Sequence, residues 1–153
     1  MDEVSDQAPA HTLPARELIE SESDVSFRIG KRFSFDAAHH LVGLRAGHKC
    51  ARPHGHTYTV EVVLAGEELV GPGFVTDFGD LKPLGEYIDG HLDHRDLNEV
   101  LDFPPTSERL AQHLAEWFVE NVEPNIDGRL VAIRVSETPA TWAEFAVGER
   151  PAS

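Results

Sequence analysis

Alternation of apolar and polar residues in two stretches constrains the fold of this chain more than any other feature. In the first stretch, apolar side chains share one parity between residues 25 and 35: Val25, Phe27, Ile29, Phe33 and Phe35. In the second, residues 56–64, the apolar side chains again share one parity: Tyr58, Val60, Val62 and Leu64. Successive side chains of a β-strand point to opposite faces, so each stretch predicts a half-buried strand.

Two helices are predicted after the second strand. The first begins near Thr76–Asp77 or at Asp80 and runs to about Gly90, with either aspartate as its cap and with Pro83 leaving its start open. The second follows Pro104–Pro105 and ends near Pro124. Thr106 can cap its start. Apolar residues then recur at helical spacing: Leu110, Leu114, Trp117 and Phe118.

Two further strands are predicted at residues 130–137 and at about 142–147. The resulting order, β-β-α-α-β-β, predicts an α+β domain in which two helices pack on one face of an antiparallel sheet. A chain of 153 residues suits one domain. We assign residues 25–150 to that single domain. We assign residues 1–24 to a disordered acidic tail, because they hold seven acidic residues against one arginine and lack apolar periodicity.

Composition argues against several classes of function. The formal net charge of −14 argues against a nucleic-acid-binding surface. No apolar run approaches the ~20 residues of a membrane span, and the N-terminus lacks the pattern of a secretory signal. Cys50 is the single cysteine, so an internal disulfide cannot form. We therefore expect a cytoplasmic protein that binds neither nucleic acid nor a membrane.

Charge is distributed unevenly along this acidic chain. Residues 37–60 contain no acidic residue, but they hold Arg45, Lys49 and Arg52 and five of the nine histidines. A local basic patch in an acidic protein predicts an anionic ligand. The alternative is a solvated loop without a ligand.

A histidine pair marks the start of the second strand. His54 and His56 share the parity of Tyr58, so both imidazoles are expected to point toward the core and could share one metal ion. His39 continues the apolar parity of the first strand, whereas His40 continues the polar parity. Three neutral imidazoles fit Zn²⁺ and leave a fourth position for water or substrate, which is typical of a catalytic site.

Neighbouring residues leave alternatives open at this point. His48 and His91 are possible substitutes as metal ligands. Cys50 lies four residues before the histidine pair, so it could be a fourth zinc ligand that closes the site and makes it structural. It could also be a base or nucleophile, since nearby Lys49, Arg52 and a zinc ion would favour the thiolate. A third possibility is an inert buried thiol.

Two further positions carry acid–base groups. Asp93 and His94 are adjacent and could form an orienting pair for proton transfer, or simply a polar turn. Glu137 has the parity of Val131, Ile133 and Val135, and a carboxylate on an apolar face is costly unless it is paired. It could bind a ligand that offers two adjacent N–H donors, or it could be solvated beyond the strand end.

Four motifs, in order, resemble a known family: Phe35-Asp36-Ala37-Ala38-His39, Cys50-x3-His54-Gly55-His56, Leu92-Asp93-His94 and Glu137-Thr138. Over roughly residues 26–147 the chain is similar to the family of 6-pyruvoyl-tetrahydropterin synthase and 6-carboxy-tetrahydropterin synthase. The resemblance implies the tunnelling fold, in which three subunits close their sheets into a barrel and two trimers stack as a homohexamer.

The resemblance also implies roles for individual residues. It implies that His39, His54 and His56 bind Zn²⁺ and that Cys50 is the base that abstracts a proton. It implies that Asp93 and His94 form a proton relay and that Glu137 anchors the pterin ring. Basic residues are expected to hold the triphosphate of the substrate, and the candidates are Lys31, Arg32, Arg45, Lys49 and Arg52.

The substrate that the resemblance implies is 7,8-dihydroneopterin triphosphate. The short Cys-x3-His-Gly-His spacing resembles the bacterial carboxy branch, whose products are 6-carboxy-5,6,7,8-tetrahydropterin, acetaldehyde and triphosphate, on the way to 7-deazaguanines such as queuosine. The alternative within the family is the pyruvoyl branch, which eliminates triphosphate. An alternative of another class is a non-catalytic zinc- or pterin-binding protein.

Overall fold

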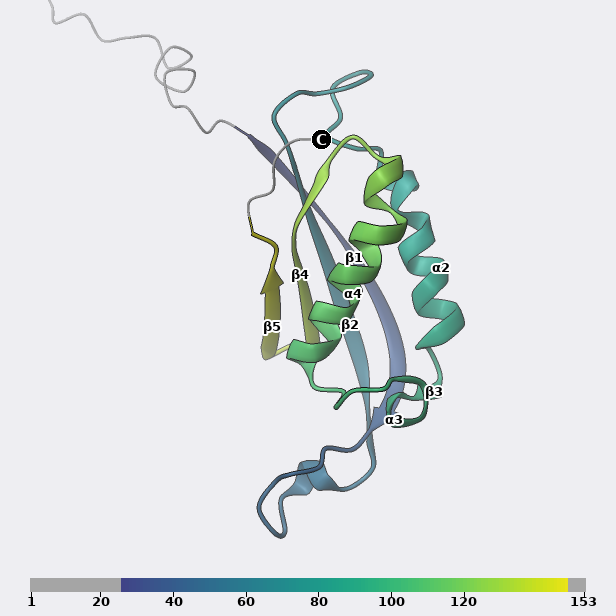
Figure 1. Cartoon of the computed structure of the whole chain (residues 1–153), viewed down its shortest axis with the longest axis vertical. Helices are drawn as coiled ribbons and strands as arrows, with labels where there is room; N and C mark the ends of the chain where they lie inside the picture. The colour runs from purple at the N-terminus through teal and green to yellow at the C-terminus, as the bar shows by residue number, and fades with distance from the viewer. Residues whose placement is uncertain (1–25, 149–153) are drawn as a thin grey trace, which may run out of the picture.

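The computed structural model describes residues 26–148, and they form a sheet covered on one face by two helices (Figure 1). Five strands make the sheet, in the order β3-β1-β2-β4-β5. Their bounds are β1 Phe27–His39, β2 His54–Gly66, β3 Arg95–Asp96, β4 Arg129–Thr138 and β5 Thr141–Ala146. The predicted α+β class and element order are confirmed, whereas the predicted acidic tail at residues 1–24 lies outside the described residues.

The sheet is mixed rather than wholly antiparallel. The four long strands pair antiparallel, as predicted, but β3 pairs in parallel with the end of β1 through Ala37 and Ala38. Short helix α3, Leu97–Val100, follows β3 directly. Neither element was predicted, because a two-residue strand has no periodicity of its own and depends on contact with β1.

The two long helices begin at local stop and cap signals. Helix α2, Lys82–His91, starts later than predicted, after a 3-10 turn, Phe78–Leu81, whose cap is Asp77. Pro83 lies in the first turn of α2, where its missing N–H costs no helical hydrogen bond. Helix α4, Ser107–Asn121, is capped as predicted by Thr106, whose hydroxyl accepts from the Arg109 N–H. Within residues 26–148, no helix combines the length and the apolar character needed to cross a membrane.

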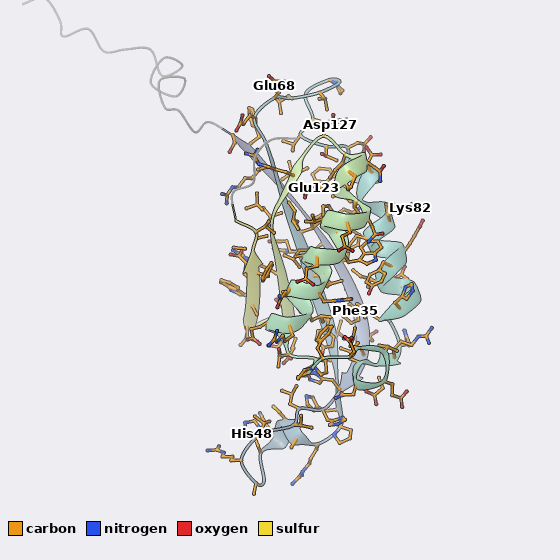
Figure 2. All side chains as sticks on the ribbon, in the orientation of Figure 1. Phe35, His48, Glu68, Lys82, Glu123 and Asp127 are labelled. Carbon is orange, nitrogen blue, oxygen red and sulfur yellow. The ribbon has the colours of Figure 1, made fainter. Side chains whose placement is uncertain are left out.

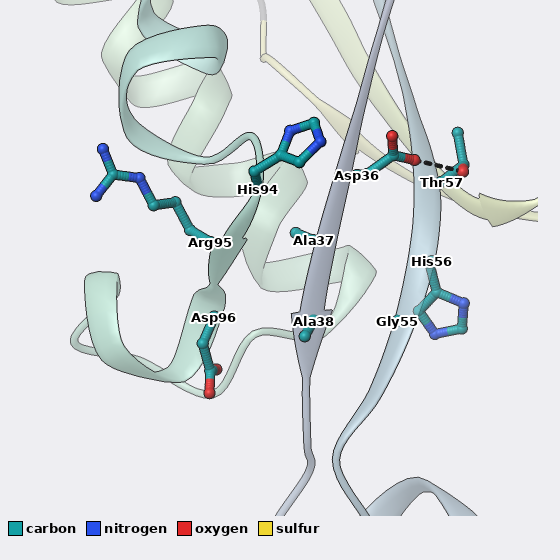
Figure 3. A pocket seen from close by; sticks show the side chains of 9 residues that line it. All are labelled: Asp36, Ala37, Ala38, Gly55, His56, Thr57, His94, Arg95 and Asp96. Atoms are coloured by element: carbon teal, nitrogen blue, oxygen red, sulfur yellow. Dashed lines mark hydrogen bonds between the residues drawn. The ribbon is translucent and has the colours of Figure 1, made fainter.

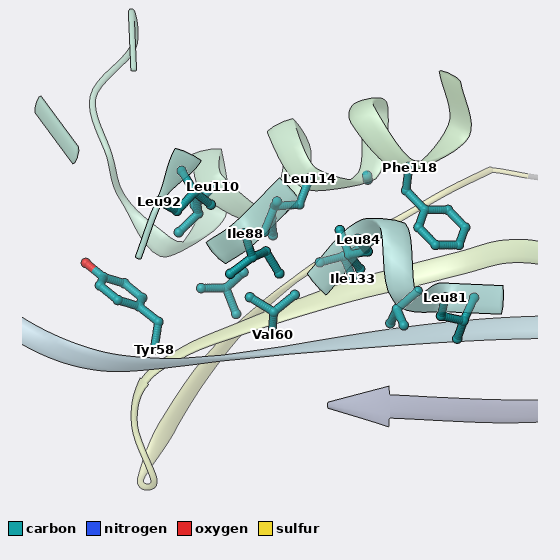
Figure 4. Close-up of a cluster of buried hydrophobic side chains, with 14 of the residues drawn as sticks. Tyr58, Val60, Leu81, Leu84, Ile88, Leu92, Leu110, Leu114, Phe118 and Ile133 are labelled. Carbon is teal, nitrogen blue, oxygen red and sulfur yellow. The ribbon is translucent and has the colours of Figure 1, made fainter. Parts of the chain in front are cut away.

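The core lies between the helices and the inner face of the sheet. Figure 4 shows leucines of α2 and α4 packed over Val60 of β2 and Ile133 of β4. Side chains of this kind contribute about 1.5–3 kcal/mol each when fully buried. Tyr58 stands at one end of the aliphatic cluster, with its hydroxyl pointing away from it (Figure 4). The parity predicted for β1 and β2 is therefore the parity that faces the helices.

A long loop joins β1 to β2 and extends beyond the end of the sheet (Figure 1). It spans residues 40–53 and contains the short 3-10 helix Lys49–Ala51. Figure 2 shows His48 on this projecting segment. Val42 and Leu44 on the loop are exposed. The loop carries the basic residues that the sequence singled out, and its base joins the strand ends that bear the histidines.

Candidate metal centre

Three histidines converge where β1 and β2 meet the loop. The antiparallel register pairs His39 with His54 and Ala37 with His56. Donor atoms of the three imidazoles all lie within 4.8 Å of one another. We call His39, His54 and His56 the histidine centre. These are the three side chains that parity selected, and their grouping follows from the period of two in both strands.

Hydrogen bonds fix the orientation of two of these rings. His39 Nδ1 lies 2.8 Å from the Pro105 carbonyl oxygen, and His54 Nδ1 lies 2.6 Å from the Arg52 carbonyl oxygen. A carbonyl can only accept, so both rings carry their proton on Nδ1 and present the lone pair of Nε2. The two Nε2 atoms face each other at 2.9 Å. Two lone pairs at this distance repel unless a proton or a cation lies against them.

His56 completes a donor set that suits a metal ion. Its Nε2 is buried and has no hydrogen-bond partner among the described residues. Burial lowers the pKa of His56, Glu137 opposes this shift, and His39 and His54 add to it. The ring therefore stays neutral, as a ligand must. Carbonyl-bound Nδ1 atoms behind two of the three rings match the outer hydrogen bonds that orient metal-binding histidines, so the histidine centre fits Zn²⁺.

A carboxylate and a phenol border the histidine centre. Glu137 on β4 places its carboxylate oxygens 3.8 Å from His39 Nε2 and 3.6 Å from His56 Nε2. Tyr58 is fully buried, stacks on Phe35 and meets the rings of His39 and His56 edge-on. Burial and the charge of Glu137 raise the pKa of Tyr58, so the phenol keeps its proton. Parity alone predicted that Glu137 faces the core, and the structure adds that it faces the histidines.

The other candidate ligands lie outside the histidine centre. His48 caps the 3-10 helix, where its Nδ1 accepts from the Cys50 N–H. His91 stacks on Tyr87 at the end of α2. Cys50 is a half-buried free thiol on the loop and is not one of the residues grouped with the three histidines. Within the described residues, the protein donors that converge are therefore three imidazoles, with Glu137 beside them.

Asp93 and His94 form the pair that the sequence predicted. The Asp93 carboxylate lies 3.0 Å from His94 Nδ1 and also accepts from the Asp36 N–H. These hydrogen bonds, first that from Asp36 and then that from His94, lower the pKa of Asp93. His94 has a φ of 58°, and its N–H donates to the Asp36 carbonyl at 2.6 Å. Its side chain is 78% exposed, so the pair is oriented by β1 but open to an incoming group.

Asp36 is a further member of this second group, and sequence reasoning missed it. Its carboxylate accepts from the Thr57 hydroxyl, and its donor atom groups with those of Asp93 and His94. Figure 3 shows this hydrogen bond and the His94 imidazole turned toward the strand that carries Asp36. An open pocket of roughly 630 Å³ lies here, lined by Asp36, Thr57, His56 and His94 among others. The signal that could have revealed Asp36 is its position in β1: it shares the polar parity and lies between the inward-facing residues Phe35 and Ala37.

The basic candidates fall in two places. Arg32 on β1 forms a 2.7 Å ion pair with Glu61, and Lys31 donates to the Phe78 carbonyl. Arg45, Lys49 and Arg52 lie on or beside the projecting loop. The two basic residues of the strand therefore have partners within the chain, whereas the other three basic residues lie on the loop.

Comparison with known proteins agrees with this arrangement of sheet and helices, which is that of the tunnelling fold of pterin synthases. The family model described as 6-pyruvoyl tetrahydropterin synthase matches residues 28–147. The chain is 33% identical over 138 residues to a Bacillus subtilis protein named 6-carboxy-5,6,7,8-tetrahydropterin synthase, covering 82% of this chain and 89% of that protein. It is 38% identical over 109 residues to a Pyrococcus furiosus protein named dihydroneopterin monophosphate aldolase, covering 71% and 86%.

A solved structure supports the same relationship at the level of the fold. The 6-pyruvoyl tetrahydropterin synthase of Caenorhabditis elegans superposes with a TM-score of 0.69 at 27% identity, covering 81% of this chain and 97% of that chain. The chain belongs to the 6-pyruvoyl tetrahydropterin synthase family.

Proposed function

We propose that this protein is a zinc-dependent lyase that converts 7,8-dihydroneopterin triphosphate to 6-carboxy-5,6,7,8-tetrahydropterin, acetaldehyde and triphosphate. The observation that carries the proposal is the approach of His39 Nε2 to His54 Nε2, which lie 2.9 Å apart, in a member of this family. Three imidazole nitrogens without a fourth protein ligand grouped with them are the donor set of a catalytic zinc site rather than a structural one.

His39, His54 and His56 would hold the metal, with carbonyl oxygens of Pro105 and Arg52 fixing two of the rings. A bound Zn²⁺ would supply Lewis acidity toward oxygens of the substrate side chain. The remaining roles belong to four side chains of the chain itself: Cys50, Asp93, His94 and Glu137. The first three would remove, orient or return a proton, and the last would bind the pterin ring.

Cys50 is the proposed base, since it lies on the loop that joins the two strands bearing the three histidines. Asp93, held ionised by the Asp36 N–H, orients His94 so that its exposed imidazole can exchange a proton with the substrate. Glu137 is the proposed anchor for the amide and amino N–H groups of the pterin. Its closeness to the histidines would set the ring beside the metal.

The carboxy branch is favoured over the pyruvoyl branch by the loop. Three residues separate Cys50 from His54, and this short spacing resembles the bacterial carboxy enzymes. The relatives named 6-carboxy-5,6,7,8-tetrahydropterin synthase, at 33% identity in Bacillus subtilis and 37% in Synechocystis, support the same choice. On this proposal the product enters 7-deazapurine synthesis, such as that of queuosine, in the cytoplasm.

A second candidate is aldol cleavage of a dihydroneopterin phosphate. It is favoured by the 38% identity with the Pyrococcus furiosus aldolase. Both reactions break the side chain of the same class of substrate, and both would use a proton-abstracting group near the histidine centre. A non-catalytic zinc-binding protein is the alternative of another class.

A product assay separates these possibilities. Purified protein loaded with zinc would be incubated with 7,8-dihydroneopterin triphosphate and, separately, with the monophosphate, and the products identified by mass spectrometry. We expect 6-carboxy-5,6,7,8-tetrahydropterin and acetaldehyde from the triphosphate. A pyruvoyl product, a hydroxymethyl pterin from the monophosphate, or no turnover of either substrate would each replace the proposal with a specific alternative.

We further propose that the chain works as a homo-oligomer, with a hexamer as the expected state. Within the described residues, β5 is an end strand, and β1 is covered only at Ala37 and Ala38 by β3. Open edges favour pairing with another chain. The registers also align Arg32, Glu61, Arg134 and Glu144 in one row of alternating charge across four strands. The row ends in opposite charges at the two edges, which suits head-to-tail pairing of copies.

The exposed loop residues Val42 and Leu44 offer further apolar surface for contact between copies. Light scattering at micromolar concentration tests the proposal. A monomer would contradict it.

A further inference from the structure

We propose that Tyr58 is a positioning residue: once a metal ion is held by the histidine centre, its phenol donates a hydrogen bond to Glu137 and holds that carboxylate beside the metal. The inference rests on the metal-binding part of the proposed function. It assigns a role to the one fully buried hydroxyl that borders the histidine centre.

The first observation is an unpaired donor. Tyr58 is 0% exposed, and its hydroxyl has no hydrogen-bond partner among the described residues. A buried unpaired polar group costs about 1–3 kcal/mol, whereas phenylalanine would fill the same space without that cost. A buried hydroxyl without a partner calls for an explanation. One explanation is that the hydroxyl gains its hydrogen bond when the metal ion binds.

The second observation is the direction of the hydroxyl. The Tyr58 ring is held by a parallel stack on Phe35, with centroids 4.9 Å apart, and by edge contacts with His39 and His56. Figure 4 shows the hydroxyl at the end of the aliphatic cluster, turned away from the leucines. The ring therefore keeps its only polar atom outside the aliphatic cluster, and His39 and His56 lie against that ring.

The third observation is the acceptor. The Tyr58 ring and the Glu137 carboxylate both lie against His39 and His56. Burial raises the pKa of Tyr58 and the charge of Glu137 adds to this shift, so the two side chains are neighbours. Glu137 already lies 3.6 Å from His56 Nε2 and 3.8 Å from His39 Nε2, and its carboxylate is the only acidic group paired with those nitrogens among the described residues.

A carboxylate at this position favours a divalent cation, and its effect depends on its orientation. Charge interactions in a partly buried site fall with distance and rise as water is excluded. Outer hydrogen bonds to groups around a metal typically change metal affinity or activity by about 10–100-fold. Tyr58 supplies such a bond from β2, the strand that also bears His54 and His56.

The test is a double-mutant cycle on zinc affinity, measured on the full chain by competition with a chromophoric chelator. Four proteins are compared: wild type, Tyr58→Phe, Glu137→Gln and the double variant. We expect Tyr58→Phe to weaken zinc binding by about 10–100-fold and to have little further effect in the Glu137→Gln background, because the phenol acts through the carboxylate. Cobalt(II) absorption spectra of the same proteins report whether the ligand geometry changes.

Two controls keep a structural role separate. Tyr87 is the other tyrosine of the chain and lies between the helices, so Tyr87→Phe is expected to bind zinc like wild type. The metal-free Tyr58→Phe protein is expected to be at least as stable to heat as wild type, because the change removes an unpaired buried atom. A purely structural tyrosine would instead give lower stability and unchanged zinc affinity.

The outcomes distinguish this inference from the function on which it rests. Equal zinc affinity in wild type and Tyr58→Phe, or an equal loss in both Glu137 backgrounds, would overturn the role of Tyr58 alone. Wild-type protein that binds zinc but fails to convert the pterin triphosphate would overturn the proposed reaction and leave the affinity cycle interpretable. Wild-type protein that does not bind zinc would overturn both.

Discussion

Two groups of histidines in this protein lie in similar aromatic surroundings but differ in how their ring nitrogens are satisfied. In the histidine centre, two Nε2 lone pairs face each other and a third has no partner among the described residues. Between helices α2 and α4, by contrast, His113 Nε2 lies 2.7 Å from the Tyr87 hydroxyl. Tyr87 in turn stacks on Trp117 and His91. We call these four residues the interhelical cluster.

The difference is the one expected between histidines that bind a metal ion and histidines with a structural role. A histidine of the interhelical cluster finds its partner within the chain, so it needs nothing from outside. His39 and His54 form hydrogen bonds to backbone carbonyls through their Nδ1 atoms, and the donor atoms of all three imidazoles lie within 4.8 Å of one another. Burial alone does not make this distinction, since the histidine centre combines the buried His39 with the half-buried His54 and His56, and His113 is half-buried as well.

Alanine substitution in the two groups should give the largest contrast. His54→Ala removes one of three donors, so we expect it to lose nearly all bound zinc and all turnover. His113→Ala should keep stoichiometric zinc and lose only stability. Metal analysis after dialysis checks both. Near-stoichiometric zinc in His54→Ala, or zinc lost by His40→Ala instead of His39→Ala, would break the comparison.

Cys50→Ala sharpens the boundary of the histidine centre. If the thiol is a base and not a ligand, the variant keeps its zinc and loses turnover by about 10²–10⁴-fold, the usual contribution of a positioned base. Zinc content and turnover are measured on the same preparation. Loss of zinc together with activity would make Cys50 a ligand and would return the site to a structural one.

Strand periodicity predicted the histidine centre because its geometry is local. The inward parity of His39, His54 and His56 depends only on the period of two, and the antiparallel register then brings the strand ends together. The cap of α4 at Thr106 and the strand face of Glu137 were predicted for the same reason. The positions of the three histidines and of Glu137 are therefore known, whereas their roles in metal binding and catalysis remain predictions.

Features built from distant contacts could not be predicted. The carbonyl that orients His39 belongs to Pro105, 66 residues away along the chain. Strand β3 exists only because Arg95 and Asp96 reach Ala37 and Ala38, and the positive φ of His94 follows from that connection. A sequence pattern records neither which loop returns to a strand end nor which carbonyl it presents there.

The smallest predicted effect is a pH dependence of stability that arises in the interhelical cluster. Burial lowers the pKa of His113 below its ordinary value of 6.5, although Glu116 and Asp102 oppose the shift. As the pH falls below 6.5, the unfolded chain therefore binds more protons than the folded one, and the free energy of unfolding decreases. The pKa of His56 shifts in the same direction, so the metal-free wild type should lose stability at low pH through both residues.

The substitution His113→Gln should remove one of these contributions and flatten the dependence of the free energy of unfolding on pH. Denaturant unfolding of metal-free protein at pH values from 8 to 5 measures the change, which should be smaller than the ~2–5 kcal/mol expected for Leu114→Ala in the core. A wild-type protein that becomes more stable below pH 6.5, or a His113→Gln profile as steep as wild type, would show that this ring does not stay neutral between the helices.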